Sequence, residues 1–189
     1  MKRRRIIEYN APVTLTFAFV SFAVLLLGWL TAGVSTRLLF SVYRAPLSQA
    51  LTYPRFFTHV LGHSGFAHFS GNITLLLVLG PNLEERYGSR TILIAMLITA
   101  FASGLAQFLL FPHTALLGAS GIVFMMILMA SLGGSRGEGV PLTLILVFLI
   151  YVGGETVSAL SSADNVSHLT HIIGGVCGAV LGIGLRKGK

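Results

Sequence analysis

The sequence contains a serine whose neighbours suit a nucleophile. Ser120 lies in the run Gly118-Ala119-Ser120-Gly121, where small residues let the backbone approach a bound group closely. If a helix begins at this serine, its unpaired N–H groups favour negative charge and could hold the oxyanion of an attacked carbonyl. A serine in this place can also do no more than cap the helix, and the motif alone leaves both interpretations open.

A histidine in an otherwise apolar stretch could supply the base that such a serine needs. His171 is followed by Gly174 and Gly178, and positions i, i+3 and i+7 share one helix face. Glycines four residues apart let a second helix pack closely against that face. Histidine can accept a hydroxyl proton near neutral pH. We therefore predict that His171 is the partner of Ser120, with a histidine bonded only to a backbone carbonyl as the alternative.

A third polar pair lies in another apolar stretch. His68 and Asn72 are four residues apart, so they share one face of a helix. Both side chains can donate hydrogen bonds, and both are costly to bury without a partner. Two such donors, together with the Ser120 N–H, would suit an oxyanion hole. Polar contacts between packed helices would explain the pair equally well.

The composition shows what kind of element must position these residues. Of the 189 residues 10% are charged and 54% are hydrophobic, and the mean hydropathy is +0.83. Soluble domains have about 25% charged residues, so an ordinary soluble domain and a disordered chain are both excluded. The single cysteine, Cys177, excludes a disulfide framework and a cysteine-based metal site. The sequence therefore predicts one all-helical membrane domain over residues 1–189.

Long charge-free stretches predict where helices cross the membrane. A helix needs about 20 apolar residues to cross about 30 Å of hydrocarbon. The stretch between Arg90 and Arg136 has room for two passes and is broken by Pro112 and Gly118. The fourth predicted span is short, at about 22 Å of helix, so its first residues should lie below the outer surface. We predict six spans at 12–33, 66–81, 91–111, 119–133, 140–160 and 167–185, joined by one long outer loop at 34–65.

The basic residues predict the orientation of this bundle. With both termini in the cytoplasm, including a short basic segment at 1–9, ten of the 13 Lys and Arg residues lie inside. This is the positive-inside bias of membrane proteins, and it accounts for the net charge of +7 without nucleic-acid binding. The inside residues are Lys2, Arg3, Arg4, Arg5, Arg86, Arg90, Arg136, Arg186, Lys187 and Lys189, and the outside residues are Arg37, Arg44 and Arg55.

The basic start followed by an apolar run could also be a secretory signal. Its apolar run is about 20 residues long, which exceeds the usual ~7–15, and no clear A-x-A cleavage site follows. We expect a first span that is retained.

With these elements in order, the chain resembles the rhomboid family of intramembrane serine proteases, in its compact six-span bacterial form. The resemblance covers roughly residues 50–185 and depends on several ordered motifs. They are His63, His68-x-x-x-Asn72, Glu84-x-Arg86, Gly118-Ala119-Ser120-Gly121 and His171-x-x-Gly174-x-x-x-Gly178.

The resemblance implies a role for each residue of these motifs. Ser120 would be the nucleophile and His171 the general base, in a dyad without an aspartate. The oxyanion hole would be formed by His68, Asn72 and the Ser120 amide. Gly118 would shape the loop before the nucleophile. Supporting positions would be Arg55 in the outer loop, Phe124 against the base, His63, Gly121, Gly174, Gly178, Glu84 and Arg86.

The resemblance also implies the setting of the reaction. Substrates would be transmembrane proteins cleaved in or next to their membrane-spanning segments, with no metal or organic cofactor and no nucleic acid. The chain would be a multi-pass integral protein of a prokaryotic inner membrane. The sequence does not predict an oligomeric state.

Three positions depart from the family pattern. Pro54 stands where a tryptophan often precedes the loop arginine, Phe124 stands where the ring against the base is often tyrosine, and Thr170 stands where alanine is common before the base. None of these removes a reacting group. We also expect Glu84 and Arg86 to form an ion pair that closes a cytoplasmic loop.

Other chemistries use some of the same residues. His59-x-x-x-His63 has the spacing of a zinc helix, but Val60 stands where the glutamate of H-E-x-x-H belongs. His68 and His171 could face each other as haem ligands. A catalytically silent rhomboid-like protein that binds membrane clients, or a small transporter, would use the same fold and polar residues.

Overall fold

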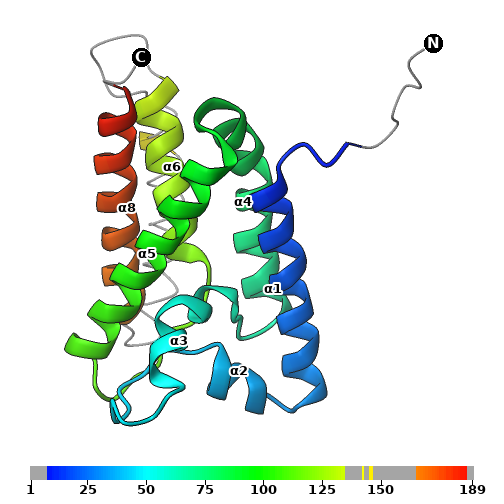
Figure 1. Ribbon diagram of the computed structural model, residues 1–189, viewed down its shortest axis with the longest axis vertical. Coiled ribbons are helices and arrows are strands. Elements are labelled where there is room, and N and C mark those ends of the chain that lie inside the picture. The colour runs from blue at the N-terminus through cyan, green and yellow to red at the C-terminus, as the bar shows by residue number, and fades with distance from the viewer. Residues whose placement is uncertain (1–7, 135–141, 143–144, 147–164, 187–189) are drawn as a thin grey trace.

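The computed structural model describes residues 8–134, 142, 145–146 and 165–186, and within these it is helical (Figure 1). An isolated bridge between Val42 and Leu116 is the one β-type pairing among the described residues. The helices, with the 3₁₀-helix η1, are α1 (Pro12–Leu30), α2 (Val34–Leu39), α3 (Thr52–Thr58), η1 (His59–Leu61), α4 (Phe66–Tyr87), α5 (Ser89–Leu110), α6 (Ser120–Gly134) and α8 (Asn165–Arg186).

The five long helices form a bundle with the two short helices α2 and α3 gathered at one end (Figure 1). The most extensive helix pair among the described elements is α6 with α8, and α6 also packs against α4 and α5. The core lies where these helices meet, around fully buried side chains such as Leu76, Ile92 and Met125. Consequently α6, which begins at Ser120, is the central helix of the described bundle.

Five of the six predicted spans correspond to helices, but their lengths differ. Among the described helices α1 and α5 are long and apolar enough to cross a membrane, while the apolar parts of α6 and α8 are shorter, at 120–132 and 170–185. The predicted span 140–160 lies almost wholly outside the described residues. The all-helical prediction is confirmed for the described part, while the count of six spans and the cytoplasmic termini stay predictions.

The helix α4 continues beyond the predicted span 66–81. It contains Pro81 and ends at Tyr87. The next residue, Gly88, caps it with a φ of +82°, a left-handed conformation that glycine adopts without strain. The extension brings Glu84 to the first turn of α1. Its carboxylate accepts the backbone N–H groups of Val13 (3.2 Å) and Thr14 (2.6 Å).

Candidate active site

The segment that leads into α6 is fixed by backbone contacts. The Gly118 N–H donates to the carbonyl of His59 at 3.0 Å, and the Val123 N–H donates to the carbonyl of Ala119 at 3.0 Å. Gly118 has a φ of +121°, which non-glycine residues rarely adopt. Ala119 is fully buried, and Ser120 is half-buried. The structure therefore places Ser120 as the first residue of a helix, with its amide among the unpaired N–H groups of the first turn.

Glycines join α6 closely to α8. A Cβ at Gly174 would overlap the carbonyl of Gly121, and a Cβ at Gly178 would overlap the carbonyl of Met125. A Cβ at Gly121 would in turn lie 3.0 Å from the Cγ2 of Thr170. The backbones of the two helices are therefore in contact at the first turn of α6, as expected for a small-residue interface.

His171 lies on α8 beside this first turn. Its ring stacks on that of Phe124, with the ring centroids 4.3 Å apart and the planes at 12°. His171 and the preceding Thr170 are each 4% exposed. Phe124 is one helical turn after Ser120, so the imidazole packs against the α6 face that carries the serine. The stack fixes the plane of the ring, which is a function that a carboxylate serves in a catalytic triad.

His68 and Asn72 project from α4 toward the other side of the same loop. A Cβ built on Gly118 would lie 2.7 Å from His68 Nε2 and 3.9 Å from Asn72 Nδ2. The Nδ1 of His68 is 3.2 Å from the hydroxyl of Ser64. When that hydroxyl donates, His68 is the tautomer that carries its proton on Nε2, facing Gly118. The Asn72 amide donates to the His68 carbonyl at 3.2 Å.

Two further histidines, from the connection between α1 and α4, pack around this group. His63 is 3% exposed and lies edge-to-face with His68, with centroids 5.1 Å apart. Its burial and the neighbouring His68 ring lower the pKa of His63 to about 4, although its contact with the Leu61 carbonyl opposes the shift. The His59 ring contacts the Arg55 carbonyl and the Ser103 hydroxyl. Because η1 ends at Leu61, His59 and His63 do not share one continuous helix as a zinc motif would require.

Arginines hold the connection between α1 and α4 in place. Arg55 is 3% exposed, donates from Nε to the carbonyl of Leu38 at 2.7 Å, and lies over the ring of Tyr43 at 4.5 Å. Arg44 donates to the carbonyls of Phe108 and Leu109, at the C-terminus of α5. Arg55 thus joins α3 to α2, and Arg44 joins the loop between α2 and α3 to α5.

The predicted ion pair of Glu84 with Arg86 does not form among the described residues. Glu84 instead binds the α1 N–H groups, and the Arg86 guanidinium lies over the ring of Tyr87 at 5.4 Å. The unpaired N–H groups at the start of a helix offer a buried carboxylate a better partner than an exposed arginine. The two residues therefore have separate roles at this end of α4.

Sequence reasoning missed two backbone connections of the site. Val42 and Leu116 exchange two backbone hydrogen bonds of 2.9 Å, which join the connection between α2 and α3 to the segment before Ser120. The carbonyl of His59 holds Gly118 from the same side. Backbone groups of irregular segments leave no pattern of side-chain types, so no signal in the sequence could have identified either contact.

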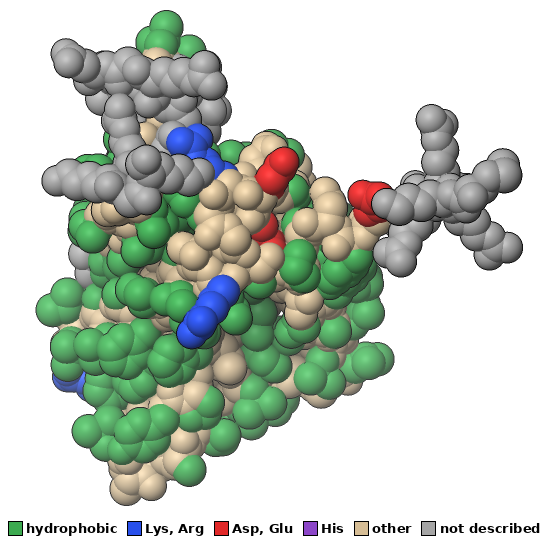
Figure 2. Space-filling view, turned by 45° about the horizontal axis from the view of Figure 1, so that its top comes forward, with side chains coloured by type: hydrophobic (Ala, Val, Ile, Leu, Met, Phe, Trp, Pro, Cys, Tyr) green, Lys and Arg blue, Asp and Glu red, His purple; other side chains and the backbone are tan. Residues whose placement is uncertain are grey.

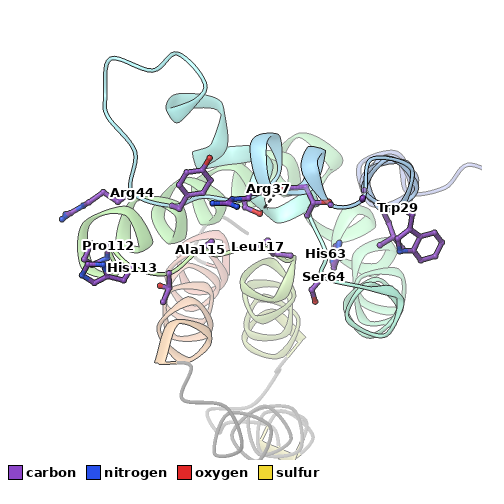
Figure 3. A pocket seen from close by; sticks show the side chains of 17 residues that line it. Trp29, Arg37, Arg44, His63, Ser64, Pro112, His113, Ala115 and Leu117 are labelled. Atoms are coloured by element: carbon purple, nitrogen blue, oxygen red, sulfur yellow. Dashed lines mark hydrogen bonds between the residues drawn. The ribbon is translucent and has the colours of Figure 1, made fainter.

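A cavity of about 780 Å³ lies beside this group of residues (Figure 3). Its walls come from the C-terminal end of α1, the connection that follows it, and the segment between α5 and α6. Ser64, which contacts His68, and Leu117, which precedes Gly118, are among its lining residues. The cavity therefore adjoins the segment that presents Ser120.

Comparison with known families decides the affiliation of this arrangement. The model of the Rhomboid domain matches residues 50–188. The chain belongs to the rhomboid family. Membership makes it an integral membrane protein of a family whose members are generally intramembrane serine proteases.

Curated relatives of the rhomboid family include proteases from bacteria. Rhomboid protease GluP of Bacillus subtilis is 26% identical over 188 residues, which is 94% of this chain and 36% of the relative. Rhomboid protease GlpG of Photorhabdus laumondii is 29% identical over 171 residues, 87% of this chain and 59% of the relative. Rhomboid-related protein 1 of Caenorhabditis elegans is 30% identical over 138 residues, which is 68% of this chain and 38% of the relative. The chain spans between about a third and three fifths of the length of these relatives.

Proposed function

We propose that this chain is an intramembrane serine endopeptidase that cleaves membrane-protein substrates with a dyad of Ser120 and His171. The observation that carries the proposal is the contact of α8 with the first turn of α6. Phe124 stacks on His171, and Gly121 packs against Thr170 and Gly174, so the imidazole and the serine lie on facing sides of one helix junction.

In the proposed reaction, His171 removes the proton from the Ser120 hydroxyl as its Oγ attacks the carbonyl carbon of the scissile peptide bond. The C–N bond then breaks, and the leaving amine takes the proton from the imidazolium. Water attacks the resulting ester of Ser120 with His171 again as base, which releases the carboxylate product and restores the serine. No Asp or Glu occurs in α6 or α8, so we propose that the stack on Phe124 orients the base.

The negative charge formed on the attacked carbonyl oxygen needs donors that are already in place. We propose the Ser120 N–H, the His68 Nε2–H and the Asn72 amide. The approach of His68 and Asn72 to Gly118 supports this, because both side chains lie against the residue two before the nucleophile. Donors fixed before the reaction stabilise the transition state without reorganising.

The proposal extends to the substrates and to the orientation of the chain in the membrane. We propose a six-span domain with both termini in the cytoplasm and with Ser120 nearer the outer face. A substrate would be a transmembrane protein whose helix unwinds near the cleavage site, because an intact helix hides its carbonyl groups. We further propose the prokaryotic inner membrane as the location.

The test is cleavage of a model transmembrane substrate by purified protein in detergent. Wild-type protein is expected to produce two fragments. The Ser120→Ala and His171→Ala variants are expected to lose at least about 10³-fold in rate while keeping the wild-type melting temperature. Ser131→Ala, on the same helix but three turns away, is the matched control and should cleave normally.

The outcomes separate the proposal from its rivals. Cleavage that persists in Ser120→Ala would refute the nucleophile. A folded wild-type protein that binds a range of transmembrane substrates without cleaving any would instead favour a catalytically silent binder of membrane clients.

A further inference from the structure

The cavity beside the active site has an unusual distribution of charge. Among its lining residues are Arg37 and Arg44, together with His113, and none of the lining residues is Asp or Glu. Figure 3 shows Arg37 between Trp29 at one edge and the Arg44–His113 edge. The walls thus present positive groups along a cavity whose volume is in the range of specific ligand sites.

Arg37 is the cation that the fold leaves available. It is exposed on α2, and its guanidinium forms no hydrogen bond or ion pair with another described residue. By contrast, Arg44 donates to the last carbonyls of α5, and Arg55 is buried on the Leu38 carbonyl. The Arg37 guanidinium is not engaged by the described residues, so its charge is available to a ligand.

The carboxylates of the described residues lie far from this cavity along the chain and at the opposite end of the bundle. Glu8 precedes α1, and Glu84 and Glu85 lie in the last turn of α4. Figure 2, which tilts the upper end of Figure 1 forward, shows acidic side chains there on a largely hydrophobic surface. That end also carries Arg86 and Arg90, so acidic and basic side chains occur there together. The described residues at the cavity end include Arg37 and Arg44 and no carboxylate.

We infer that this cavity is a substrate subsite that takes an acidic peptide segment next to the scissile bond. The inference depends on the proposed protease function and names its preferred substrates: membrane proteins with Asp or Glu in the segment bordering the cleaved helix, on the cavity side. A peptide fits better than a lipid headgroup because Leu117, which lines the cavity, directly precedes Gly118 in the segment that leads to Ser120. A chain whose carbonyl lies at Ser120 can therefore extend directly into the cavity.

The size of the preference follows from the exposure of the charges. Ion pairs at partly exposed sites are weak and are screened by salt. We expect an acidic substrate to be cleaved about threefold to tenfold faster than a neutral one in kcat/KM at low ionic strength. The preference should shrink as salt is added.

The experiment compares three substrates that differ only in two bordering residues, which are Asp, Asn or Lys. They are cleaved at low and high salt by wild-type protein, Arg37→Gln, Arg37→Glu and the control Arg90→Gln, an exposed arginine at the start of α5. Wild-type protein and Arg90→Gln should prefer Asp. Arg37→Gln should lose most of that preference, and Arg37→Glu should prefer Lys. Equal cleavage of all three substrates by wild-type protein would overturn the inference and leave the protease function intact.

A binding measurement keeps the two proposals apart. A short fluorescent peptide with two aspartates is titrated with Ser120→Ala protein, with and without Arg37→Glu, and followed by anisotropy. Binding that needs Arg37 supports the subsite even if wild-type protein cleaves nothing, an outcome that would refute only the protease function. Binding that is independent of peptide charge but displaced by phosphatidylglycerol would assign the cavity to a lipid headgroup and overturn the inference.

Discussion

Gly118→Ala tests the geometry of the proposed oxyanion hole most sharply. The new methyl group would lie 2.7 Å from Nε2 and 2.8 Å from Cε1 of His68. An ordinary van der Waals contact begins at 3.4 Å, so the ring must move by at least about 0.7 Å. Displacements near 1 Å in an active site cost about 10²-fold in rate, and the loss of one oxyanion donor costs about 10²–10³ in kcat. We therefore predict a fall in kcat of about 100-fold.

The same substitution has a separate cost in stability. Gly118 has a φ of +121°, and forcing another residue into such a conformation costs about 1–3 kcal/mol. Initial rates on a model transmembrane substrate, with melting curves of each variant, separate the two effects. Gly71→Ala is the matched control because it neighbours Asn72 on α4 and its Cβ would meet nothing within 4 Å. It should keep full activity and melt at or slightly above the wild-type temperature.

A double-mutant cycle tests whether Gly118→Ala lowers activity by displacing His68. If Gly118→Ala acts by displacing His68, then adding it to His68→Ala should cost little further activity, because the donor is already lost. Wild-type activity in Gly118→Ala, or full additivity in the double variant, would refute the placement of His68 at the oxyanion.

Three other predictions follow from contacts of the described helices. Gly174→Ala should lower stability by about 1–3 kcal/mol, because its methyl group would overlap the backbone of α6, whereas the adjacent Gly175→Ala, with open space around it, should not; urea unfolding in detergent distinguishes them. Phe124→Ala should lower kcat and shift the pH profile of kcat/KM, because the ring that holds His171 is lost, and Phe124→Tyr should preserve both. Burial favours the neutral acid of Glu84, but hydrogen bonds from Ser89 and the α1 N–H groups outweigh it and lower its pKa. Its contribution to stability is therefore present above the ordinary carboxyl pKa of about 4.5 and is lost as the pH falls through the lower folded pKa, so Glu84→Gln should flatten the acid limb of a plot of stability against pH.

The sequence could predict those features that leave a local pattern. Charge-free apolar stretches located the five long helices, although among the described helices α1 and α5 alone are apolar over a membrane-spanning length. The beginning of α6 at Ser120 was predictable because Gly118 interrupts an uncharged stretch too long for one helix. The glycine spacing after His171 predicted close packing on that face, and the structure has Gly174 and Gly178 against the backbone of α6.

Features that depend on contacts between distant segments could not be predicted. Hydropathy ended the second span at 81, whereas α4 continues to Tyr87 because Glu84 finds its partners on α1, about 70 residues earlier. The same contact explains why the expected ion pair of Glu84 with Arg86 does not form. The hold of the His59 carbonyl on Gly118 has the same character, since a backbone acceptor carries no residue-type signal.

The central claim is that Ser120 is a nucleophile activated by His171. The most direct measurement is reaction with a fluorophosphonate, followed by proteolysis and mass spectrometry to locate the modified residue. The account predicts one phosphonylated site, at Ser120, in wild-type protein, and a large loss of labelling in His171→Ala. Labelling at another serine, or unchanged labelling of Ser120 in His171→Ala, would contradict it.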